Sequence, residues 1–153
     1  MTINELMTEM ADRFGIAGEI APDKDGVYRL GADGVTVAFM EVPEMNAALV
    51  FGEVCELPVE GRERFLTALL RENFMGRGAP GGAFSLSEGD KVYLHRYVDL
   101  PSAETGAFCT ALEDFVAALV NWRNLAKDYG PVAAERAAKA ASDAEAAQGF
   151  LQV

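Results

Sequence analysis

Residues 27–57 read VYRLGADGVTVAFMEVPEMNAALVFGEVCEL, and this stretch decides the fold class. Apolar and polar residues alternate in three runs, which predicts three β-strands, at 27–30, 35–42 and 47–57. A glycine-containing turn at 31–34 joins the first two strands. Because connections this short join antiparallel neighbours, we expect an antiparallel meander. Gly52, inside the third strand, marks a bulge or a close approach of another segment.

Helical spacing of apolar residues places further elements on both sides of the meander. Before it, a helix over 3–14 is expected, with Thr2 and Glu5 as a capping box. After it, we expect a helix over 60–75, a hairpin of strands 83–87 and 91–99, and a long helix capped by Ser102. The order α-β-β-β-α-β-β-α predicts an α+β domain in residues 1–130, with a twisted antiparallel sheet flanked by helices.

The last part of the chain, residues 131–153, has a different composition. It is rich in alanine and contains no large apolar side chain before Phe150. Alanine favours a helix, but a helix without an apolar face to bury is marginal in water. We expect a tail that is helical or disordered.

Composition excludes several classes of function. The 153 residues include 24 Asp and Glu against 13 Lys and Arg, a net charge of −11. Such acidity repels nucleic acid and anionic membrane surfaces. The longest apolar run, residues 115–120, is far shorter than the roughly 20 residues that span a bilayer. The amino terminus lacks the pattern of a secretory signal, so we expect a cytoplasmic protein.

Few residues suggest catalysis or cofactor binding. Cys55 and Cys109 have no metal-ligand or redox spacing, and His95 is the single histidine. The glycine loop at 76–82 follows a helix and precedes a strand, the reverse of a dinucleotide site. We therefore expect no enzyme, no metal and no cofactor.

Two other hypotheses stay open at this point. The first is a non-catalytic module that binds a small molecule or regulates, with a pocket between the sheet and the first helix. Its lining would come from Tyr28, Tyr93, His95 and Tyr97. The second is an enzyme that uses Cys55 or Cys109 as a nucleophile, which requires a thiol that reacts at neutral pH.

The order of elements, together with several short motifs, resembles the class I type III secretion chaperones of the CesT/SycE type, the Tir chaperone family. The resemblance covers about residues 3–128. The motifs are Leu57-Pro58, LLRENF at 69–74, GGAFSL at 81–86, KVYL at 91–94 and Leu100-Pro101.

The resemblance implies a cytoplasmic homodimer that holds the amino-terminal segment of a secreted effector in extended form, without consuming ATP. Whether it also docks on the secretion ATPase is left open. The first helix and first three strands would supply the effector-binding grooves, which on this chain indicates Leu6, Met10, Val37, Phe39, Met40, Leu49 and Phe51. The dimer contact would be formed by Phe65, Leu66, Leu69, Leu70, Phe74, Phe84 and Leu86.

Overall fold

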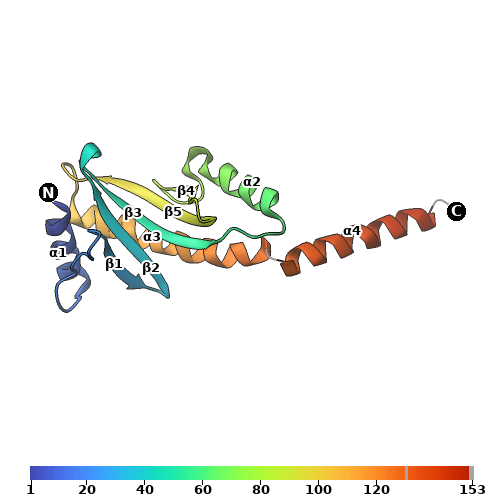
Figure 1. The fold of residues 1–153 in the computed structure, drawn as a ribbon, viewed down its shortest axis with the longest axis horizontal. Helices are drawn as coiled ribbons and strands as arrows, with labels where there is room; N and C mark the ends of the chain where they lie inside the picture. Colours follow the sequence, from blue (N-terminus) through green and yellow to red (C-terminus); the bar gives the residue numbers. More distant parts are fainter. Residues whose placement is uncertain (130, 152–153) are drawn as a thin grey trace.

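A computed structural model describes residues 1–129 and 131–151, with side chains for 1–129 and 138–148 (Figure 1). The elements are α1 (Ile3–Phe14), β1 (Tyr28–Ala32), β2 (Val35–Val42), β3 (Ala47–Glu56), α2 (Arg62–Asn73), β4 (Ala83–Leu86), β5 (Lys91–Asp99), α3 (Thr105–Ala126) and α4 (Pro131–Leu151). Short 3₁₀ turns follow β2, α2 and α3. The predicted α+β order is confirmed. The helix expected over 60–75 is shorter at both ends, because Gly61 before it and Met75 after it have positive φ angles of 70° and 59°, which an α-helix does not accommodate.

The five strands form one antiparallel sheet in the order β1-β2-β3-β5-β4. Helices α1 and α3 cover one face, and α2 lies beside β4 at the far edge (Figure 1). The core lies between this covered face and α3, where Val37, Phe39, Val50, Leu94 and Leu119 are all buried. β1 stands at the other edge of the sheet, and its outer side pairs with no strand in the described residues.

The ends of the helices follow local chemistry. At α1, the Thr2 amide donates to Glu5 Oε2 at 2.7 Å and the Glu5 amide donates to Thr2 Oγ1 at 3.2 Å, the expected capping box. Ser102 does not cap α3, contrary to the prediction. Its amide donates to Asp99 Oδ2 at 3.1 Å, which makes a turn at the end of β5, and α3 begins only at Thr105.

The predicted close approach at Gly52 is confirmed. A Cβ built there would lie 2.4 Å from Leu119 Cδ2, and Leu119 is fully buried. We expect Gly52→Ala to lower the free energy of unfolding by about 1–3 kcal/mol, because the fully buried Leu119 side chain must move from its place in a packed core. Urea denaturation measures the loss. Gly31→Ala is the matched control, since nothing lies within 4 Å of its Cβ position; equal stability losses in both variants would contradict this account.

The alanine-rich residues 131–151 form α4, which extends away from the sheet (Figure 1). Residues 138–148 are exposed. The side chain of Phe150, the first large apolar residue expected in this tail, lies outside the described residues, as do Gly130, Gln152 and Val153.

Candidate functional site

An apolar groove lies beside the free edge of β1, and we call it the edge groove. It has a volume of about 510 Å³. The end of α1, strand β1 and one side of α3 form its walls, with Phe14, Ile16, Leu30, Val37, Leu112, Val116 and Ala117 as its apolar lining. Leu30 is half-buried and faces Val37 across the β1–β2 ladder. The free edge of β1 thus lies next to the apolar edge groove.

The residues predicted to form effector-binding grooves divide into two groups. Leu6, Met10, Val37 and Phe39 are 0–1% exposed and belong to the core under α1 and α3. These four side chains are not accessible at the surface of this structure, although Val37 also lines the edge groove, and their role in effector binding stays a prediction. Met40, Leu49 and Phe51 are half-buried, and they point to the opposite face of the sheet.

This opposite face, which we call the outer face, carries no helix in the described part of the chain (Figure 1). Leu49, Phe51, Tyr93, His95 and Tyr97 line a shallow hollow of about 410 Å³ on it. Burial lowers the pKa of His95 below its ordinary value, and His95 Nδ1 lies 3.1 Å from Ser85 Oγ. Tyr28 pairs with the buried Phe39 on the covered face, so the pocket of the small-molecule hypothesis is not assembled.

The residues predicted for the dimer contact fall into two groups, one largely buried and one exposed. Phe65, Leu69 and Phe84 are buried within one subunit, and Leu66 is half-buried. Leu70, Phe74 and Leu86 are 69%, 64% and 46% exposed. Together with Met75, these three form what we call the helix patch, at the end of α2 and on β4. The Asn73 amide side chain holds α2 to β4 by donating to Phe84 O and accepting from Phe84 N.

The two thiols lie apart from the single histidine. Cys55 pairs with the buried Val92 and lies on the covered side of the sheet, whereas His95 is on the outer face. Cys109 is buried in α3. A Cys-His pair is therefore not formed in the described residues.

We expect Cys55 to react slowly with iodoacetamide at neutral pH. Burial, with a smaller effect of the Glu53 charge, raises the pKa of its thiol from 9.0 to about 11. Since only the thiolate reacts, alkylation at pH 7 falls about 100-fold below that of an ordinary cysteine and rises as the pH approaches 11. Mass spectrometry of the labelled peptide measures the rate. Rapid labelling at pH 7 would restore the cysteine-enzyme hypothesis.

The described residues, 1–129 and 131–151, contain neither a candidate metal site nor a candidate membrane-spanning helix. No three His, Cys, Asp or Glu side chains gather in a way that would hold a metal ion. None of the helices there combines the length and the apolar character needed to cross a bilayer.

Sequence reasoning missed most of the edge groove. Phe14, Leu30 and Val116 come from three different elements, α1, β1 and α3, and neither Leu30 nor Val116 stands out in its own segment. One local signal was present in Phe14, a large apolar residue at the exposed end of an amphipathic helix.

The single antiparallel sheet with helices on one face has the fold of type III secretion chaperones, as the match to solved structures shows. A chain of the ExsC–ExsE complex shares 24% identity at a TM-score of 0.65, with 80% of this chain and 92% of that chain covered. The Yersinia pestis chaperone SycH, solved with a fragment of YscM2, shares 19% sequence identity at a TM-score of 0.63, and the match covers 79% of this chain and 99% of that chain. A chain of the ExoU–SpcU complex of Pseudomonas aeruginosa shares 15% sequence identity at a TM-score of 0.58, and the match covers 80% of this chain and 93% of that chain.

Residues 5–123 match the Tir chaperone protein (CesT) family. The chain therefore belongs to this family of type III secretion chaperones. No curated protein shows significant similarity to it.

Proposed function

We propose that this chain is a cytoplasmic, non-catalytic homodimeric chaperone that binds the amino-terminal segment of a secreted effector, here called the client, and keeps it extended. Family membership supports the chaperone role. The related structures of the ExsC–ExsE and ExoU–SpcU complexes support a protein partner. Holding an extended segment needs complementary surfaces and no reactive group.

The observation that carries the proposal is the edge groove beside the unpaired edge of β1. A client strand can add to this edge through main-chain hydrogen bonds, which any sequence can supply. Every second side chain of that strand then points toward α3, where the groove accepts apolar groups. Because ordering an unfolded segment costs conformational entropy, the apolar groove must provide most of the affinity.

The outer face offers a second apolar surface for the same client. Met40, Leu49 and Phe51, predicted to bind effector, are accessible there, and Tyr97 beside them is 47% exposed. A client that wraps around the sheet edge meets both surfaces in turn.

Homodimerisation is proposed through the helix patch. Large apolar side chains exposed at the end of one helix and on the strand beside it are typical of an interaction surface. Burying this patch against its own copy gives a symmetric contact, the commonest form of homodimer.

The test is co-expression with the first residues of a secreted protein encoded beside this gene. We expect the client segment to stay soluble and to co-purify with the chaperone only when both are present, and light scattering to show two chaperone copies per complex. A client segment that stays soluble alone and does not bind would overturn the proposed function.

A further inference from the structure

Strands β2 and β3 separate at one end of the sheet and leave a cleft between them. Their pairing ends at Ala38–Phe51, and from Gly52 onward β3 pairs only with β5. A register shift between Glu53 and Cys55 bends β3 further from β2. Figure 1 shows β2 and β3 close together at one end and diverging as they run past α3. Although β3 lies between β2 and β5 in the sheet, the edge of β3 that faces β2 is therefore unpaired in the described residues from Gly52 onward.

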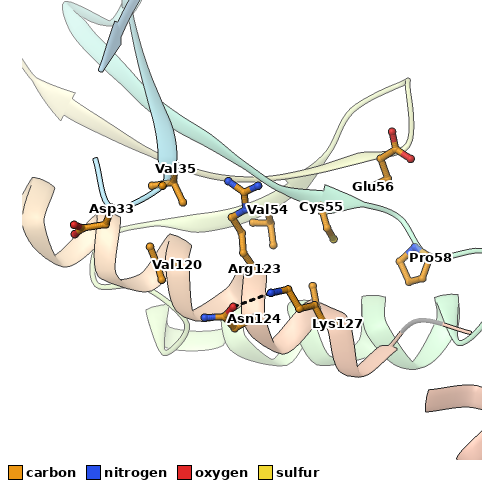
Figure 2. Close-up of a pocket in the computed structure, with 12 residues that line it drawn as sticks. Asp33, Val35, Val54, Cys55, Glu56, Pro58, Val120, Arg123, Asn124 and Lys127 are labelled. Carbon is orange, nitrogen blue, oxygen red and sulfur yellow. Dashed lines mark hydrogen bonds between the residues drawn. The ribbon is translucent and has the colours of Figure 1, made fainter. Parts of the chain in front are cut away.

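This opening, which we call the fork cleft, has a volume of about 560 Å³. Val35 and Val54 form apolar walls, α3 provides the floor with Val120 and Arg123, and Lys127 adds to it directly after the end of α3. In Figure 2 the Arg123 side chain rises from α3, and its guanidinium lies beside Val54 between the two strands. The cleft thus combines a free strand edge, apolar walls and a cation.

The cations on the floor have no acidic partner in the described residues. Arg123 and Lys127 are four residues apart and lie on one side of α3. The ion pairs of residues 1–129 and 138–148 are formed by other cations, Arg29, Arg62 and Lys91. Lys127 Nζ donates only to Asn124 Oδ1, at 3.2 Å. In a chain with a net charge of −11, two cations without an ion-pair partner on the floor of a cleft with apolar walls favour an acidic ligand.

Two further observations place this positive charge inside the cleft. Burial raises the pKa of Cys55, which lines the same cleft, and the Arg123 charge opposes that rise. The two carboxylates at the rim, Asp33 and Glu56, point away from the Arg123 guanidinium in Figure 2.

We propose that the fork cleft binds an acidic part of the client in extended form, with its main chain along the free edge of β3 and a carboxylate on Arg123 and Lys127. This inference rests on the proposed function and names the chemistry of its ligand. Asp33 lines both the edge groove and the fork cleft, so the two are neighbours along α3. From Leu112 to Lys127 the helix spans about 22 Å, the length of roughly seven extended residues.

The experiment compares two fluorescein-labelled peptides of about eight alternating valines and threonines, in which the last two threonines are replaced by aspartate or by lysine. Fluorescence anisotropy measures their affinities for the full-length protein. We expect the aspartate peptide to bind about tenfold tighter, through charge-assisted hydrogen bonds. Arg123→Glu abolishes this preference, and the bound aspartate peptide slows alkylation of Cys55.

Lys24→Glu is the matched control, because it changes the net charge equally at an exposed turn away from the cleft. If it removes the preference as Arg123→Glu does, long-range repulsion explains the result and the site is wrong. If the two peptides bind equally well and Leu30→Asp abolishes the binding of both, the proposed acidic site in the fork cleft is wrong. The proposed client site in the edge groove then still stands. Binding of neither peptide overturns both.

Discussion

Leu30→Asp is expected to weaken client binding by more than about 100-fold while the protein stays folded. Leu30 lines the edge groove from the free strand β1, next to Leu112 and Val116 of α3. Losing its contact with an apolar client side chain removes about 1.5–3 kcal/mol, and the carboxylate must also lose water when the client closes over it. Titration of a labelled client segment measures the affinity, and a thermal melt followed by circular dichroism checks the fold.

Thr36→Asp is the matched control for the edge groove. It adds the same charge on the neighbouring strand, at an exposed position directly across from Gly31. We expect its affinity to stay within about threefold of the wild type. If Leu30→Asp also stays within that range, the client does not use the edge groove.

Phe39→Asp shows why burial decides which variant is informative. The Phe39 ring is fully buried and packs at 6.3 Å, centroid to centroid, against Phe108 of α3. A carboxylate at this position would be buried among apolar side chains without a hydrogen-bonding partner, so we expect the variant to unfold. A loss of client binding in an unfolded variant would say nothing about the groove. The Leu30 side chain, in contrast, is half-buried before a client binds, so Leu30→Asp tests the groove without unfolding the protein.

Local features of the fold were predictable from the sequence because each depends on neighbouring residues. The capping box of Thr2 and Glu5, the Asp33-Gly34 turn and the alternation along β2 all gave the right element. The start of α3 was not predictable in this way. The Ser102 amide and hydroxyl both donate to the Asp99 carboxylate, so the hydroxyl that would cap a helix is used in a turn at the end of β5 instead.

The functional surfaces were less predictable because they depend on which face of the sheet the helices cover. Alternation shows that Val37 and Phe39 share a face and that Met40 lies on the other. It does not show which of the two faces α3 will bury. The edge groove also joins Leu30 to Val116 across most of the chain, and no local pattern records such a contact.

Replacing Leu70 and Phe74 together by aspartate is expected to convert the proposed homodimer into a folded monomer of 16.4 kDa. Both side chains are exposed in one subunit, so the substitutions cost little in folding. In a symmetric interface each substitution counts twice, and four large apolar groups at about 1.5–3 kcal/mol each amount to about 6 kcal/mol or more. Size-exclusion chromatography with light scattering at micromolar concentration measures the mass.

Val59→Asp is the control, since Val59 is 86% exposed but lies in the loop before α2, outside the helix patch. It should leave the dimer intact. Each copy carries a net charge of −11, so repulsion opposes association and the wild-type dimer should tighten as salt rises. The double variant should stay monomeric in high salt, because screening removes repulsion without restoring apolar contact. If it dimerises there, the copies meet through another apolar surface, and the outer face around Phe51 and Tyr97 is then the one to test.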